Sequence, residues 1–205
     1  MWALIEDGSI TKHLSGNRGI TIGDIQYSRN IFSFRWSNEE REAIGLYEIV
    51  WNNSKKKDEE YYTNTNQTFT YDADAGTVTA TYGDATAKAH ADTLFTAQDE
   101  SDGKGTEGEV KVEGLKTKKI RTIKKEAAGE LASTDWYIVR KADSSTALPS
   151  AITNHRAAVR TKCAEMESAI TIASNTAAIK TLYTYTEQED GAVTRPLGEL
   201  PTLEV

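Results

Sequence analysis

Four side chains in the second half of the sequence could form one binding constellation. Asp135 and Trp136 are adjacent, and Arg156 and Arg160 lie four residues apart further along. A carboxylate pairs with a guanidinium, and an arginine also stacks on a tryptophan ring. In the simpler interpretation the group only fastens two helices together. In the functional one, Trp136 and Arg160 face a partner protein, because aromatic and arginine side chains commonly anchor interfaces.

Other motifs match chemical sites by their letters but lack the surroundings that such sites need. The sequence 103–108 matches G-x-G-x-x-G, yet an acidic stretch precedes it instead of a buried strand. His90 and Asp92 lie near Asp99 and Asp102 without the framework that fixes metal ligands. Calcium held loosely at the turn of Asp72 and Asp74 or at the acidic cluster 99–102 stays an open alternative. Because no nucleophile or acid–base pair stands out either, we expect no enzymatic activity and no cofactor.

The cysteine and the histidines are expected to be structural. Cys163 falls in the apolar seam of a long helix, where burial raises the thiol pKa and makes the group unreactive. As the single cysteine of the chain, it cannot form an internal disulfide. The three histidines, His13, His90 and His155, are far apart in sequence and are expected on the surface.

Charge excludes one large class of partner. The net charge of −7 opposes binding to nucleic acid, which requires a positive surface. The one basic run, Lys116 to Lys125, includes Ile120 and Ile123 and is typical of the solvated face of an amphipathic helix. The N-terminal apolar stretch meets an acidic turn after five residues, too early for a signal peptide or a membrane span. We expect synthesis in a cytoplasm and no membrane insertion.

We predict an α+β fold made of small modules, because hydrophobic residues are only 38% of the 205. Its predicted parts are a β-rich N-terminal module (1–51), a Tyr/Thr-rich hairpin region (52–98), a flexible linker (99–108), a helical hairpin (109–183) and a C-terminal tail (184–205).

Turn and capping residues predict the local structure of the first half. Asp7-Gly8 and Asp74-Ala-Gly76 predict hairpin turns, and Ser37 with Glu40 forms a capping box. Strands are expected at 20–22, 31–34 and 46–51, and a weak helix at 84–99. The second hairpin must lie on another module or on another chain, because an isolated hairpin is marginal in water.

Helical periodicity begins after residue 115. One stripe comprises Ile120, Ile123, Ala127 and Leu131, and the next helix begins at Pro149. The seam of that helix comprises Ile152, Arg156, Val159, Cys163, Met166, Ile170 and Ala173. The two helices should pair antiparallel through a turn at 134–136, with a short third helix near 177–183. Since one short stripe cannot cover the long seam, we expect a homo-oligomer, with a trimer as the first hypothesis.

This region resembles the C-terminal module of bacteriophage tail-fibre assembly proteins and related small tail proteins. The shared pattern is a leucine, a Thr-Asp-Trp group, a proline and a helix with paired arginines, here Leu131, Thr134, Asp135, Trp136, Pro149, Arg156 and Arg160. The resemblance covers roughly residues 115–175 and brings no catalytic centre. Trp36-Ser37, Glu40, Gly45 and Tyr47 also look like the start of such tail proteins.

The resemblance implies a non-enzymatic tail structural protein that binds within the tail or tail-fibre complex of the virion. Its expected partners are other phage tail or fibre proteins. About thirty residues follow the arginine helix, where the family usually ends, which favours an assembled part over a pure chaperone. Two alternatives stay open. One is a fibre-assembly chaperone absent from the mature virion, and the other is a receptor- or carbohydrate-binding module that uses Tyr61, Tyr62, Tyr71 and Tyr82.

Overall fold

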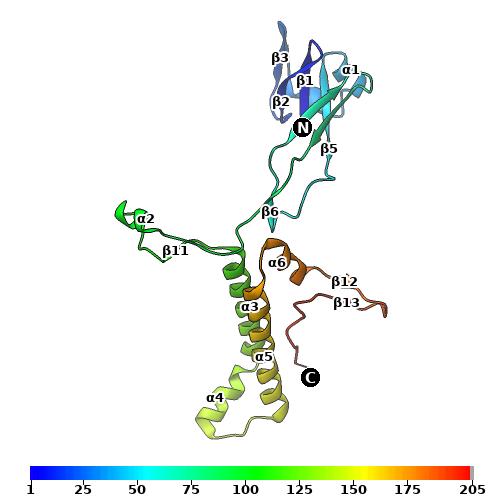
Figure 1. Cartoon of the computed structure of the whole chain (residues 1–205). Coiled ribbons are helices and arrows are strands. Elements are labelled where there is room, and N and C mark those ends of the chain that lie inside the picture. Colours follow the sequence, from blue (N-terminus) through cyan, green and yellow to red (C-terminus); the bar gives the residue numbers. More distant parts are fainter. Residues whose placement is uncertain (204–205) are drawn as a thin grey trace. The chain divides into compact units, whose positions relative to one another are not determined.

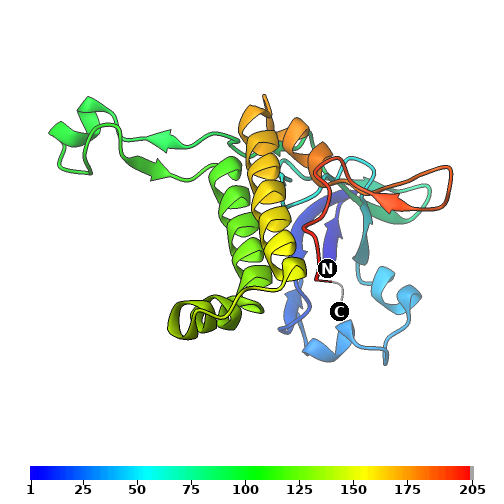
Figure 2. The ribbon, with the colours of Figure 1, turned by 90° about the horizontal axis from the view of Figure 1, so that it is seen from below.

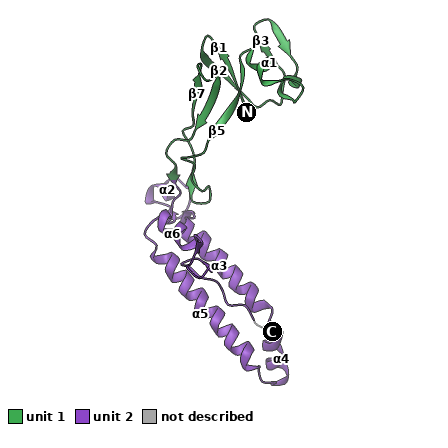
Figure 3. Ribbon diagram, turned by 90° about the vertical axis from the view of Figure 1, so that its right-hand side faces the viewer, with its two compact units in different colours: residues 1–86 green, residues 87–205 purple. Residues whose placement is uncertain are grey.

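The computed structural model describes residues 1–203, which fold into two compact units that divide after residue 86 (Figure 3). Strands dominate the first unit, and helices dominate the second (Figure 1). The predicted α+β fold is therefore confirmed. The division after residue 86 corrects the predicted boundary at the 99–108 segment.

A five-stranded sheet forms the frame of the first unit. The strand order is β2-β1-β5-β8-β7, and only the β5–β8 pair is parallel. Asp7 and Gly8 both have positive φ, as the predicted tight turn between β1 and β2 requires. The sheet strands are β1 (Trp2–Glu6), β2 (Ser9–Leu14), β5 (Leu46–Asn52), β7 (Thr68–Asp72) and β8 (Thr77–Thr81).

The sheet curls so that its two edge strands approach each other. His13 on β2 and Phe69 on β7 place their rings 4.1 Å apart. The inner face buries Ala3, Ile49, Val78 and Ala80, with aromatic residues packed around them. Because the β7–β8 hairpin completes the same sheet as β1 and β5, residues 1–51 and 52–98 are not separate modules. The expectation that this hairpin lies on another element is confirmed.

The segment between β2 and β5 covers the other face of the sheet and buries Leu4, Ile20, Ile31 and Leu46. The predicted strand at 31–34 is wrong, since Ser28 accepts the Asn30 amide and begins a 3-10 helix that buries Ile31. The capping box is confirmed. The elements here are β3 (Ile20–Ile22), β4 (Ile25–Tyr27), η1 (Arg29–Phe32) and α1 (Asn38–Glu42).

Gly45 joins α1 to β5 at a φ of +78°, where a Cβ atom would lie 2.4 Å from the Ile5 carbonyl oxygen. Only glycine satisfies both constraints. Two short strands, β6 (Tyr62–Thr63) and β9 (Thr86–Ala87), complete the elements up to residue 87.

The predicted weak helix at 84–99 is wrong, because most of this segment is extended and caps the next helix. The carbonyl oxygens of Ala89 and His90 accept the amides of Leu115 and Lys116. Asp92 accepts the Gly114 amide and the Thr117 hydroxyl, each at 2.7 Å, and these bonds lower its pKa. A helical 84–92 could not present these groups to the first amides of α3.

The predicted linker is instead the tip of an ordered arm that extends away from the helices (Figures 1 and 2). Thr96 and Asp99 form a capping box, and the Lys111 ammonium lies 2.8 Å from Asp99. These contacts hold the Asp99 pKa at about 2. Polar contacts therefore order a segment that has few apolar residues. The arm comprises β10 (Thr93–Leu94), α2 (Ala97–Ser101) and β11 (Val110–Val112).

Two long helices, α3 (Leu115–Ala132) and α5 (Ser150–Ile172), pack side by side in the second unit (Figures 1 and 2). Every residue of the predicted α5 seam is buried. The predicted connecting turn at 134–136 is wrong, because α4 (Asp135–Ser144) occupies the connection. The remaining elements are α6 (Thr176–Tyr183), β12 (Thr186–Glu187) and β13 (Val193–Thr194).

The C-terminal segment covers the part of the α5 seam that the short stripe of α3 was not expected to cover. Leu197 is buried in the same cluster as Val159, Met166 and Ile170, and Leu200 packs against it. The Leu197 amide donates to the Leu182 carbonyl oxygen, which fixes the segment on α6. The seam of α5 is thus covered within one chain.

Ile170 and Ile172 provide a matched test of this packing. Ile170 is fully buried and Ile172 is 78% exposed, two residues apart on one helix. We expect Ile170→Ala to lower the free energy of unfolding by about 2–5 kcal/mol, since it leaves a cavity. Ile172→Ala should change it by less than about 0.5 kcal/mol. Urea unfolding followed by helical circular dichroism measures both, and equal effects would contradict this packing.

Candidate partner-binding surface

The guanidinium of Arg156 joins three acceptors where α3 ends and α4 begins. Its Nη1 atom donates to the Leu131 carbonyl oxygen at 2.8 Å, the Thr134 hydroxyl at 2.7 Å and an Asp135 carboxylate oxygen at 2.8 Å. Arg156 and Thr134 are buried, whereas the Asp135 side chain is mostly exposed. The structure thus pairs Asp135 with Arg156, one of the two arginines predicted for this role.

The backbone explains why a cation suits this position. The last carbonyl groups of α3 have no partner within the helix and carry partial negative charge, which a guanidinium complements. Asp135 opens α4, where a carboxylate is favourable for the converse reason. Arg156 therefore joins the C-terminal end of one helix to the N-terminal end of the next.

Trp136 does not close the end of the helix pair, because its side chain is 52% exposed. Its ring stacks on that of Tyr137 with centroids 4.1 Å apart, and the Arg140 guanidinium lies 4.7 Å from the Trp136 centroid. Arg160 is exposed, and it donates a long 3.5 Å hydrogen bond to the Arg156 carbonyl oxygen. Arg160 therefore belongs to neither the buried contact nor this aromatic stack.

The aromatic–arginine surface, defined as Trp136, Tyr137 and Arg140, was only partly found by sequence reasoning. Tyr137 and Arg140 were missed, although Trp136 and Arg140 are four residues apart and so share one face of a helix. Val139, three residues after Trp136 on the helix, extends the surface with further exposed apolar atoms, whereas Ile138 is exposed on the other side of α4. No residue of α4 is buried, so this helix presents its apolar side chains outward.

Two predictions about titratable side chains of α5 have opposite outcomes. Cys163 is buried as expected, and burial, together with its hydrogen bond to Glu167, raises the thiol pKa. The prediction of a surface His155 is wrong. It lies three residues after Ile152 and four before Val159, so the helical repeat places it beside the buried seam. Its Nε2 atom has no hydrogen-bond partner within residues 1–203.

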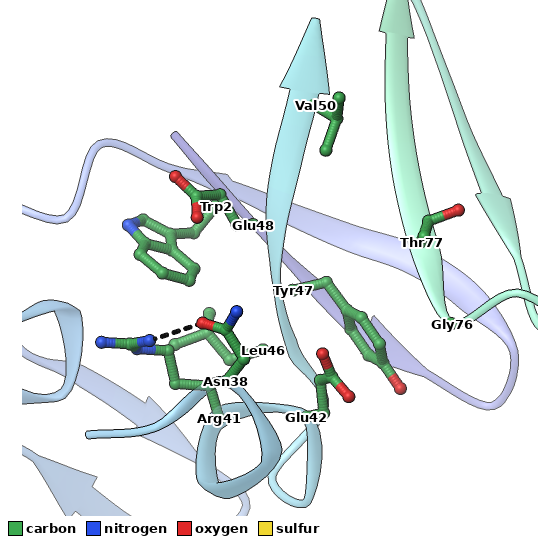
Figure 4. Close-up of a pocket in the computed structure, with 10 residues that line it drawn as sticks. All are labelled: Trp2, Asn38, Arg41, Glu42, Leu46, Tyr47, Glu48, Val50, Gly76 and Thr77. Carbon is green, nitrogen blue, oxygen red and sulfur yellow. Dashed lines mark hydrogen bonds between the residues drawn. The ribbon is translucent and has the colours of Figure 1, made fainter. Parts of the chain in front are cut away.

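A cavity of about 180 Å³ lies in the first unit beside α1 (Figure 4). Arg41 is buried there, with its guanidinium 4.7 Å from the Trp2 ring, and it donates to the Ile31 carbonyl oxygen and to Asn38. The guanidinium therefore fastens the covering segment to the sheet. Glu42, Glu48 and Thr77 also line the cavity and supply polar atoms.

The tyrosines predicted as a sugar-binding platform pack mainly within the first unit. Tyr61 is buried, and the hydroxyl groups of Tyr71 and Tyr47 are hydrogen-bonded at 3.2 Å, which together with burial raises the Tyr47 pKa to about 12. The Tyr82 ring lies 5.3 Å from the Trp51 ring. Their aromatic faces are therefore partly occupied by neighbouring rings.

Comparison of the chain with protein-family models, with curated proteins and with solved structures finds no match. Within residues 1–203, no helix is long and apolar enough to cross a membrane. The same residues contain no group of three or more His, Cys, Asp or Glu side chains placed to hold a metal ion.

Arg156 and Arg160 offer a matched pair for the buried contact. We expect Arg156→Met to lower the free energy of unfolding by about 3 kcal/mol, because it leaves Thr134 and the end of α3 without their charged donor. Arg160→Met should stay within about 0.5 kcal/mol of the parent chain. Chemical denaturation of the full chain measures the free energy of unfolding of both variants. A larger loss of stability for Arg160→Met than for Arg156→Met would show that the contact has been assigned to the wrong arginine.

Proposed function

We propose that this protein is a non-enzymatic structural part of a bacteriophage tail, made in the host cytoplasm and assembled into the virion. One observation carries the proposal. The residues that resemble the tail-fibre assembly module divide into a buried group and an exposed one. Arg156 holds Leu131, Thr134 and Asp135 together, while Trp136 lies on the surface.

The aromatic–arginine surface has the composition of a protein-binding anchor. Trp, Tyr and Arg are the residues that most often dominate binding energy, and aromatic side chains lose little entropy when they are covered. Stacking on Tyr137 and Arg140 holds the Trp136 ring in place before a partner arrives. Exposed Val139 would be covered in the same contact. The proposed partners are other tail or fibre proteins.

The C-terminal segment favours a lasting structural role over a transient chaperone. The residues after α5 form α6 and a short β12–β13 ladder, and Leu197 enters the helical core. They are an integrated part of the unit, beyond what the resembled module requires. A sugar-binding role is less favoured, because the tyrosines that would carry it mostly pack against other side chains.

Quantitative mass spectrometry of purified particles separates the structural role from the chaperone role. The particles must come from the phage whose genome encodes this chain. We expect its peptides at a fixed ratio to other tail proteins in every preparation. Presence in the infected-cell lysate with absence from purified particles would instead identify an assembly chaperone.

Trp136→Ala tests the surface itself. Because the ring is half-exposed, we expect a stability loss of only about 1 kcal/mol, together with markedly lower incorporation of the chain into particles. Phe34→Ala is the control, since it removes an aromatic side chain that is almost fully exposed in the first unit. Normal incorporation of both variants would rule out Trp136 as an anchor.

A further inference from the structure

The arm presents a bare apolar face. Leu94 pairs with Val110 across the β10–β11 ladder, and Thr93 pairs with Val112. Residues opposite each other share a face, so Leu94 and Val110 point to the same side. A register shift between Thr93 and Leu94 interrupts the regular alternation next to Val112, which is the third exposed apolar residue of this ladder. Leu94, Val110 and Val112 are 47%, 47% and 57% exposed. An isolated two-stranded ladder with such a face is marginal in water unless something covers it.

The other face of the arm is filled by its own residues. Phe95 packs closely against Gly105, where a Cβ atom would lie 2.6 Å from the ring. The Lys111 ammonium lies 5.7 Å from the centroid of the same ring and also pairs with Asp99. Only the Leu94 side therefore needs a partner.

Backbone and side-chain contacts fix the root of the arm at the N-terminal end of α3. Ala89, His90 and Asp92 bind the first residues of α3, and Gly114 approaches Ala91 too closely for any side chain. From this root the arm extends away from α3 and α5 (Figures 1 and 2). Within residues 87–203 no other element covers this apolar face, so the covering surface comes from outside this unit.

Charge identifies a surface of this same chain as the complement. The arm, residues 93–112, has five acidic residues and two lysines, a net charge of −3. The α3 helix has six basic and two acidic residues, a net charge of +4 in a chain whose total is −7. Such opposite patches attract each other and select the orientation of contact.

The basic charge of α3 is available on its outer side. Lys118, Arg121 and Lys125 lie on the side opposite buried Ile123 and Ala127. Neither Lys118 nor Lys125 forms an ion pair within residues 1–203, and on the arm Glu107 and Glu109 likewise form none there. Arg121 is partly neutralised by Glu113.

We propose that the chain self-associates by arm exchange, in which the arm of one copy lies on the outer face of α3 of a second copy. Leu94, Val110 and Val112 are covered in the contact, and Glu107 and Glu109 meet Lys118 and Lys125. This differs from association through the α5 seam, which the chain already covers itself. The inference rests on the proposed tail role, for which self-association is expected. It is tested on the purified chain, so its failure and the failure of the virion role can be distinguished.

Sedimentation velocity of the full chain at micromolar concentration is the first test. We expect an oligomer, and a clean monomer would overturn the proposal. The triple variant Leu94→Thr, Val110→Thr, Val112→Thr keeps strand-forming residues and should weaken association by about tenfold or more. Val193→Thr is the control, since Val193 is an exposed valine on the other short ladder of this unit. Unchanged association of the triple variant, with circular dichroism like that of the parent, would also overturn the proposal.

A charge exchange tests the receiving surface. The pair Glu107→Lys, Glu109→Lys and the pair Lys118→Glu, Lys125→Glu should each weaken association when present alone. The chain that carries all four changes should recover it, because every contact regains an opposite charge. Recovery in the combined variant supports arm exchange. If both double variants associate more weakly and the combined variant does not recover association, α3 does not receive the arm.

Discussion

The guanidinium of Arg156 is the contact on which the arrangement of the second unit depends. It is buried between two helix ends, where it satisfies a carbonyl group of α3 and the Thr134 hydroxyl and pairs with the first residue of α4. A buried charge is tolerated only where such partners surround it. The contact therefore fixes where α3 stops and how α4 leaves it. The orientation of α4 in turn places Trp136, Tyr137 and Arg140 on the surface.

Apolar packing in the same unit is completed by a segment distant in sequence. The stripe of α3 and the seam of α5 meet, but the cluster also includes Leu197 from the C-terminal segment. The apolar side chains of the long α5 seam are thereby buried within one chain. Exposed apolar side chains remain elsewhere in this unit, among them Val139 on α4 and Val112 on the arm. Both are surfaces that a partner can cover.

Polar contacts shape the parts that have little apolar surface. Asp92 caps α3 and fixes the root of the arm, while Asp99 caps α2 and binds Lys111 at its tip. Each carboxylate has a lowered pKa because these donors favour its charged form. In the first unit Arg41 has a similar role, since its guanidinium ties the covering segment to the Ile31 carbonyl oxygen and the Trp2 ring.

The sequence by itself determined the features that depend on near neighbours. The Asp7-Gly8 turn, the Ser37 capping box and the burial of the α5 seam follow from local spacing. The choice of Arg156 over Arg160 as the partner of Asp135 was made by the tertiary structure. Tertiary structure alone decided the parallel β5–β8 pairing, the extended 89–92 segment that caps α3, and the exposure of Trp136. Each of these depends on a partner distant in sequence or on how completely a neighbour covers a side chain. Local periodicity identifies which face is apolar, but packing determines what covers it.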